Sequence, residues 1–75
     1  MENYDLEKKE LAVGLRRMRK KHNLSQENVA KVLHINRSSY ASYELAKTTI
    51  SIFGLISLFK FYNISFNEFI RICKD

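Results

Sequence analysis

The sequence of 75 residues has no proline, only two glycines and a single cysteine. One cysteine, Cys73, excludes an intrachain disulfide, and with only two histidines elsewhere a tetrahedral zinc site lacks ligands. Cys73 is therefore interpreted as a small, partly buried apolar residue near a helix end. No apolar run approaches the roughly 20 residues of a membrane span, and the start MENYDLEKKE lacks the apolar core of a secretory signal. We expect a cytoplasmic protein with no metal, no cofactor and no membrane partner.

Apolar residues recur every three or four positions along the whole chain, and no alternating stretch is long enough for a strand. This spacing predicts an all-α fold. A chain this short buries only about 60% of its unfolded surface and supports one core, so we expect a single domain over residues 1–75. Residues 1–5 are expected to form a flexible arm.

Polar residues that favour helix ends divide the chain into five segments. Predicted helices cover residues 6–22, 25–33, 37–44, 52–62 and 66–71, with N-caps at Ser25, Asn36, Ser51 and Ser65 and ends at Asn23 and Asn63. The second and third helices are separated by a short turn, which predicts a helix-turn-helix at about residues 25–45. The fourth helix is expected to bury the stripe Ile52, Leu55, Ile56 and Phe59.

The third helix carries a strip of small polar residues. Tyr40 and Tyr43 lie three apart and are expected to face inward, whereas the outward strip consists of Arg37, Ser38, Ala41, Ser42 and Leu45. An arginine can bond bidentately to guanine, serine bonds to several base edges, and an alanine methyl can touch the thymine methyl. The strip therefore predicts base contacts in the major groove of double-stranded DNA.

Charge supports an anionic partner, because the net charge is +5 and five cations crowd into residues 16–21. Helix N-termini offer unpaired N–H groups to phosphates, and the polar loop after the third helix lies beside the reading strip. The candidate phosphate contacts are Ser25, Gln26, Asn36, Lys47, Thr48 and Thr49.

The segment LRRMRKKHNLSQENVAKVLHINRSSYASYELAK resembles the helix-turn-helix of the lambda-repressor and Cro-like regulators, the Xre family. The likeness runs from about Leu11 to Ile70 and rests on the combined spacing of Arg19, Leu24-Ser25-Gln26, Val29-Ala30, Leu33 to Ile35, Tyr43-Glu44, Ile64 and Phe69. The resemblance implies five helices, dimeric binding to a two-fold symmetric operator and a role in transcription. Repressor, activator, antitoxin and restriction-controller roles all fit.

The resemblance also implies roles for single residues. Arg19 would pair with Glu44, which makes Glu44 structural, and Leu45 would approach a phosphate through its backbone. Three positions depart from the family pattern: His34 stands at a turn glycine, Leu45-Ala46 replaces a second glycine, and Ile50 replaces a proline. We expect the His34 turn to survive, because histidine can adopt the left-handed region, and the loop after the third helix to differ in shape.

Two phenylalanines of the fourth helix, Phe53 and Phe61, lie away from its predicted buried stripe. Off-stripe aromatic residues indicate an association surface, so Phe53, Phe61, Phe66 and Ile70 are predicted to form an isologous homodimer contact. The alternative is local packing of these residues against the N-terminal arm or the last helix.

An enzyme is not expected, because the sequence has no phosphate-binding glycine loop, no Ser-His-Asp set and no buried carboxylate pair. Nothing indicates a small-molecule ligand either. The alternative to DNA binding is a protein-interaction module, in which the same fold binds a toxin or another regulator and DNA contact is secondary.

Overall fold

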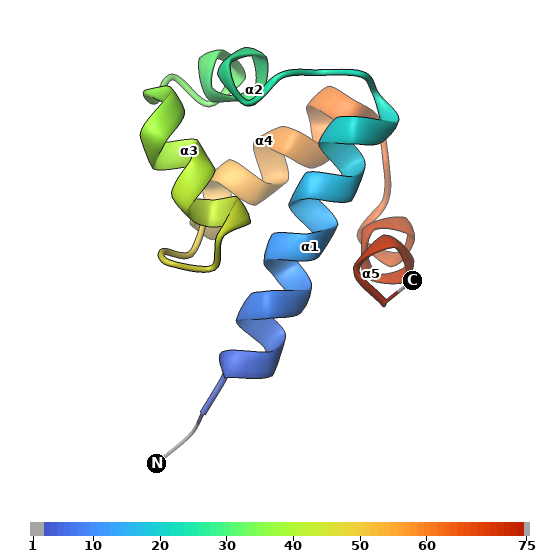
Figure 1. The fold of residues 1–75 in the computed structure, drawn as a ribbon. Coiled ribbons are helices and arrows are strands. Elements are labelled where there is room, and N and C mark those ends of the chain that lie inside the picture. Colours follow the sequence, from blue (N-terminus) through green and yellow to red (C-terminus); the bar gives the residue numbers. More distant parts are fainter. Residues whose placement is uncertain (1–2, 75) are drawn as a thin grey trace.

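Five helices form the computed structural model, which describes residues 3–74 (Figure 1). They are α1 (Asp5–Lys21), α2 (Gln26–Val32), α3 (Arg37–Glu44), α4 (Ile52–Tyr62) and α5 (Phe66–Lys74). The described residues contain no strand, which confirms the all-α expectation. Helix α5 continues past Arg71, its predicted end, because Cys73 in its last turn is buried in the core. Helix α1 begins at Asp5, inside the expected 1–5 arm, and residues 1 and 2 of that arm lie outside the described part.

Four helices begin at the predicted capping residues. The side chains of Ser25, Asn36 and Ser51 accept hydrogen bonds from the backbone N–H three residues later. Ser65 does the same for the N–H of Glu68, at 3.1 Å. Each cap satisfies one of the N–H groups that the first turn leaves without an intrahelical partner, so these short polar side chains set where the helices start.

Four helices also end in the same way, in a left-handed residue that is not glycine. These residues are Asn23, His34, Ala46 and Asn63, with φ between 56° and 60°. In each case the next residue donates its N–H to the carbonyl five positions earlier, as in Lys47 to Ser42 at 3.0 Å. This bond pattern is that of a Schellman turn. The turn at His34 therefore exists as expected, and the turn at Ala46 closes like the other three despite the missing glycine.

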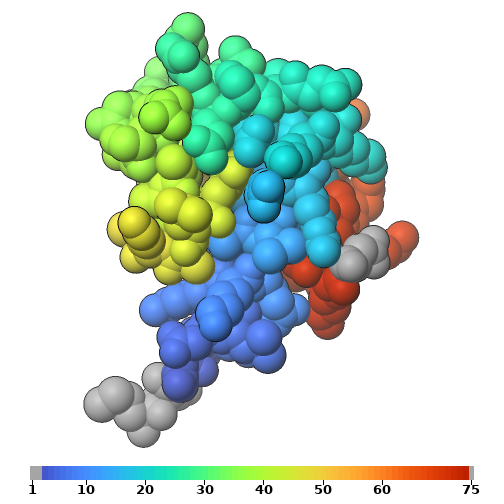
Figure 2. Space-filling view, viewed as in Figure 1, coloured from blue at the N-terminus to red at the C-terminus, as the bar shows by residue number. Residues whose placement is uncertain are grey.

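The core lies around α1, which passes between α3 on one side and α5 on the other, with α4 behind it (Figure 1). The largest fully buried side chains come from four different helices: Leu15, Met18, Val29, Tyr40 and Leu58. In the space-filling view, the surface of α1 runs between that of α3 and that of α5 (Figure 2). Helix α1 therefore connects two sides of the molecule that have different contacts.

Helices α1 and α5 approach closely at Gly14. A Cβ atom on Gly14 would lie 2.2 Å from the sulfur of Cys73 and 3.1 Å from the ring of Phe69. Such a distance is far below van der Waals contact, so any larger residue at this crossing requires the Cys73 side chain or the two helices to shift. No pattern in the sequence predicts this role of Gly14.

The predicted buried stripe of α4 is wrong at two of its four positions. Leu55 and Phe59 are partly buried, but Ile52 is 60% exposed and Ile56 is 43% exposed. The residues buried in their place are Leu58 and Tyr62. Helix α4 carries apolar residues on every side, so periodicity alone could not select the buried face.

The first turns of α1 extend beyond the rest of the bundle (Figure 1), and residues 5–9 are all exposed. Of the helices described, none combines the length and the apolar character needed to cross a membrane.

Candidate nucleic-acid interface

Helix α3 is anchored by its tyrosines and presents its opposite face to solvent. Tyr40 is completely buried and Tyr43 is partly buried, as predicted, and their rings meet edge to face at 6.2 Å. Of the predicted reading strip, Arg37 and Ser38 are exposed, whereas Ala41 and Ser42 are partly buried. The strip therefore lies on the accessible side of α3 and is most open at the N-terminal end of the helix.

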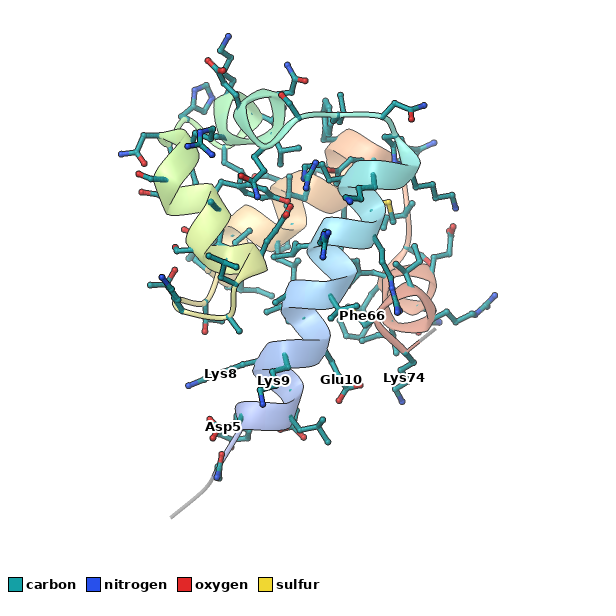
Figure 3. The ribbon with its side chains drawn as sticks, viewed as in Figure 1. Asp5, Lys8, Lys9, Glu10, Phe66 and Lys74 are labelled. Atoms are coloured by element: carbon teal, nitrogen blue, oxygen red, sulfur yellow. The ribbon has the colours of Figure 1, made fainter. Side chains whose placement is uncertain are left out.

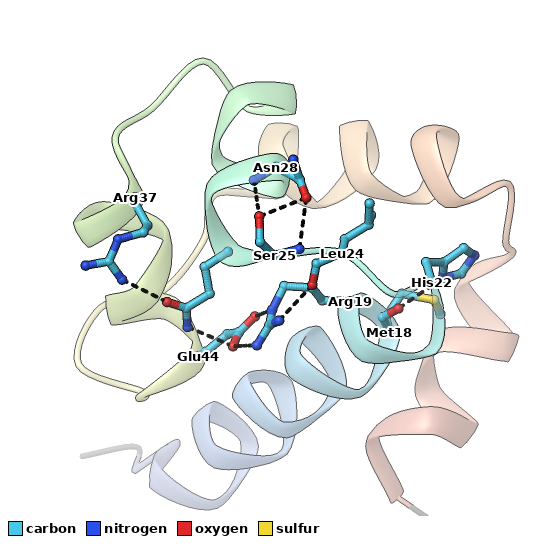
Figure 4. Close-up of polar contacts among 9 residues, drawn as sticks. Met18, Arg19, His22, Leu24, Ser25, Asn28, Arg37 and Glu44 are labelled. Carbon is cyan, nitrogen blue, oxygen red and sulfur yellow. Dashed lines mark hydrogen bonds and ion pairs between the residues drawn. The ribbon is translucent and has the colours of Figure 1, made fainter.

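An ion pair between Arg19 of α1 and Glu44 of α3 holds the two helices together (Figure 4). Nε of Arg19 donates to Oε2 of Glu44 at 2.8 Å, and Nη2 donates to Oε1 at 3.0 Å. A third N–H of Arg19 donates to the carbonyl of Leu24, at 2.9 Å. The two side chains are only 12% and 4% exposed, so the pair is bidentate and largely removed from water.

Gln26 extends this ion pair to the start of the reading helix. Its amide nitrogen donates to Oε1 of Glu44 at 3.1 Å, and its amide oxygen accepts from Nη1 of Arg37 at 3.3 Å (Figure 4). One hydrogen-bonded chain thus runs from Arg19 to Arg37. The sequence predicts Gln26 only as a phosphate contact, and it does not predict this link because nothing in the local pattern relates residues 26, 37 and 44.

The side chains that bond to Glu44 favour the ionised form of its carboxyl group. Burial by itself would raise the pKa of the Glu44 carboxyl, but interactions with Arg19, Tyr40 and Gln26 outweigh burial and leave that pKa below its ordinary value. On the other partner, the hydrogen bonds to Glu44 raise the pKa of the Arg19 guanidinium above its ordinary value. Both partners therefore stay charged at neutral pH, and the brace between α1 and α3 is permanent.

The hydroxyl groups of Ser38 and Ser42, on the outward strip of α3, already have partners within the protein. Ser38 donates to the side-chain oxygen of Asn36 at 2.9 Å, and that oxygen also caps the helix. Ser42 donates to the carbonyl of Ser39 at 2.7 Å and shares a hydrogen bond with the Thr48 hydroxyl. A ligand that bonds to these serines must share or replace such bonds, so Arg37 is the side chain of the strip best placed to reach outward.

The predicted phosphate contacts lie at both ends of α3. Ser25 and Gln26 stand at the start of α2, where the Ser25 hydroxyl is engaged in a capping box with Asn28. Lys47, Thr48 and Thr49 are exposed in the loop that follows the C-terminal end of α3. Asn36 is exposed at the N-terminal end. The two groups therefore flank the reading strip.

Within the described residues, no three His, Cys, Asp or Glu side chains come together in a way that could hold a metal ion.

A helix-turn-helix family model, HTH_3, matches residues 15–69 of the chain. The match covers all of α2 and α3, the Arg19–Glu44 pair and the Gln26 link. No curated protein matches the sequence at a significant level. The matched model describes a DNA-binding domain rather than a catalytic one. The chain therefore belongs to the Cro/C1-type, Xre-like helix-turn-helix family of DNA-binding transcription regulators.

Proposed function

We propose that this protein regulates transcription by binding a specific duplex DNA sequence, with α3 in the major groove. The observation that carries the proposal is the exposed polar strip of α3, braced from behind by the bidentate Arg19–Glu44 pair. A helix that reads bases must be held in a fixed orientation, because a base contact depends on hydrogen-bond geometry. The brace supplies that orientation before DNA arrives.

Arg37 is proposed as the principal base contact. It is exposed at the first turn of α3, where reading helices of this kind approach base edges, and Gln26 holds its guanidinium from one side. Bidentate bonding to a guanine is the contact that its geometry favours. Ser38, Ala41 and Ser42 are proposed to contact neighbouring base pairs. Ser25, Gln26, Asn36, Lys47, Thr48 and Thr49 are proposed to contact phosphates.

The test begins with selection of bound sequences from random duplex DNA, followed by fluorescence anisotropy on the selected site. Arg37→Ala should weaken that site by about 1–3 kcal/mol and relax its preference at one base pair. Lys47→Ala should weaken all duplexes alike and make the salt dependence shallower. Absence of duplex binding by the unchanged protein at low salt contradicts the proposal.

We propose that the protein binds as a homodimer on a two-fold symmetric operator. Phe53 is 79% exposed, Phe61 is 47% exposed and Phe66 is 58% exposed, and Ile70 is partly buried. Exposed apolar side chains that gather into one patch mark sites of protein–protein contact. Burial between two copies removes that area from solvent.

Two different hollows border three of these four residues, so variants at each hollow can map the contact. Phe66 and Ile70 line one beside Leu11, whereas Phe53 lines another beside Tyr43. Sedimentation of Phe53→Asp/Phe61→Asp and, separately, of Phe66→Asp should show half the mass for the variant whose residues lie in the contact. An unchanged dimer mass for both variants at micromolar concentration contradicts the predicted interface, and a monomeric unchanged protein contradicts the dimer.

The exposed apolar residues of α4 support the alternative function, a protein-interaction module. Ile52 and Phe53 are both exposed by more than half, and Ile56 lies one turn further along the helix. If the unchanged protein binds no duplex and remains a monomer, this alternative replaces the proposal.

A further inference from the structure

In the basic segment of α1, residues 16–21, some charged side chains bond to other parts of the fold and others do not. Arg17 donates to the carbonyl of Ile72 at 2.9 Å, and Arg19 pairs with Glu44. Arg16 and Lys20 are exposed, and within residues 3–74 neither side chain takes part in a hydrogen bond or an ion pair. The two lie one helical turn apart and therefore share a face of α1.

That face borders the reading helix. Arg16 and Lys20 line a hollow of about 350 Å³ together with Arg19, Gln26, Glu44 and Leu45. Gln26 bonds to Arg37 at the start of α3, and Leu45 follows its last residue. The hollow is therefore bounded by the C-terminal end of the reading helix and by Gln26 of α2, which bonds to the first residue of the reading helix.

The hollow is electropositive. Its only acid, Glu44, is neutralised by the bidentate contact with Arg19, which leaves the charges of Arg16 and Lys20 uncompensated. Two like charges one turn apart repel each other, and an anion between them removes that repulsion. An anionic ligand is therefore the partner that this surface fits.

The identity of the anion follows from the size of the groove. A major groove of about 12 Å accepts one helix, whose diameter with side chains is roughly 10–12 Å. When α3 occupies the groove, the element beside α3 meets the phosphate wall. On the side of Gln26 and Leu45, that element is the C-terminal half of α1.

We infer that Arg16 and Lys20 form a clamp for DNA backbone phosphates, in addition to the contacts at α2 and at the loop after α3. This inference rests on the proposed function. The clamp binds phosphodiester groups without regard to base sequence, and it makes α1 part of the DNA-binding surface. Its contribution must therefore appear in the salt dependence of binding and be the same for all duplexes.

The experiment compares Arg16→Gln/Lys20→Gln with a control, Lys21→Gln/Lys60→Gln. Both variants lose two positive charges, from exposed side chains that form no hydrogen bond or ion pair within residues 3–74. Lys21 adjoins Lys20 but points about 100° around the helix, and Lys60 lies on α4. Affinity for a duplex of unrelated sequence is measured by anisotropy between about 0.05 and 0.2 M salt.

For Arg16→Gln/Lys20→Gln, the slope of log K against log salt should become shallower by about 2 for each bound chain, with an affinity loss on the order of 10-fold or more. The control should change that slope by much less. The charge-preserving variant Arg16→Lys/Lys20→Arg should keep the slope of the unchanged protein. Ethylation interference should show that the clamp variant no longer requires one or two backbone phosphates in each half-site.

The inference is overturned if Arg16→Gln/Lys20→Gln, the clamp variant, has the same slope of log K against log salt as the unchanged protein. It is also overturned if the clamp variant and the control lose the same amount of affinity. In both cases the unchanged protein still binds DNA, so the proposed function survives. Failure of the unchanged protein to bind any duplex overturns both. Thermal melting followed by circular dichroism confirms that each variant is folded.

Discussion

The two sides of α1 make contacts of different kinds. Toward α3, Arg19 reaches Glu44 through two directed hydrogen bonds, and Gln26 continues the chain to Arg37. Toward α5, the absence of a side chain at Gly14 lets Cys73 and Phe69 approach closely. Directed bonds fix an orientation, whereas close packing fixes a distance. Arg17 adds one directed bond to the Ile72 carbonyl of α5, but the bidentate ion pair and the bonds through Gln26 lie on the side of the proposed DNA-binding helix.

The largest expected effect comes from breaking the α3 side. Glu44→Ala leaves Arg19 with an unpaired charge in a site that is mostly removed from water, so the free energy of unfolding should fall by about 3 kcal/mol or more in urea denaturation. The control is Glu27→Ala, which removes an exposed pair with Lys31 at 4.0 Å and should cost less than about 0.5 kcal/mol. Similar losses in the two variants would show that the buried pair does not brace the fold.

The α5 side is tested by Gly14→Ala. The added methyl group meets the Cys73 sulfur, and we expect a loss of about 2 kcal/mol in the free energy of unfolding despite the higher helix propensity of alanine. Gly14→Ala/Cys73→Ala should recover part of that loss, because the opposing sulfur is gone. If Gly14→Ala proves as stable as the unchanged protein, close packing does not set the α1–α5 distance.

A smaller effect concerns Tyr62, whose buried hydroxyl has no hydrogen-bond partner among residues 3–74. Burial raises the pKa of Tyr62 to about 12 from its ordinary value of 10.0. Between these two pH values the Tyr62 hydroxyl keeps its proton in the folded state and has lost it in the unfolded state. The resulting stability is complete below pH 10 and is lost as the pH rises toward 12. Between pH 10 and pH 11, the free energy of unfolding should therefore fall by about 1 kcal/mol less in Tyr62→Phe than in the unchanged protein.

At neutral pH, Tyr62→Phe should change the free energy of unfolding little, because an unpartnered hydroxyl contributes no hydrogen bond. Chemical denaturation at pH 7, 10 and 11 measures both effects. An alkaline loss that is identical in the variant and the unchanged protein contradicts the role given to Tyr62.

The smallest expected effect on the free energy of unfolding concerns the left-handed turn at Ala46, which follows α3. Ala46 adopts a φ of 60°, which costs an L-residue about 1 kcal/mol and costs glycine almost nothing. Ala46→Gly should therefore raise the free energy of unfolding by about 0.5 kcal/mol, because glycine also has more freedom when unfolded. Ala41→Gly, within the helix, should lower it by about 1 kcal/mol. A loss at both positions would contradict the left-handed turn.

The sequence was sufficient to predict features that depend on one residue and its near neighbours. Ser25, Asn36 and Ser51 were identified as caps, and the turns at Asn23, His34 and Asn63 were expected, because capping and left-handed turns are decided within a few positions. The inward tyrosines of α3 followed from helical spacing in the same way.

Features that depend on which helices become neighbours could not be predicted. The buried face of α4 depends on the position of the other helices, since apolar residues surround the helix, and so Ile52 and Ile56 were assigned wrongly. The Gly14–Cys73 contact joins residues 59 positions apart, and the chain through Gln26 joins three helices. Neither leaves a periodic signal in the sequence.

Helix α1 also has a consequence for local dynamics, because it runs from solvent into the core along its own length. Residues 5–9 are exposed at one end, whereas Leu15 and Met18 are almost completely buried toward the other. Backbone amides in the first turns can exchange with deuterium by fraying, which requires little free energy. Amides near Met18 exchange only when the bundle opens. A single helix therefore spans most of the range of local unfolding free energies in this protein, with its least protected end farthest from the proposed phosphate clamp.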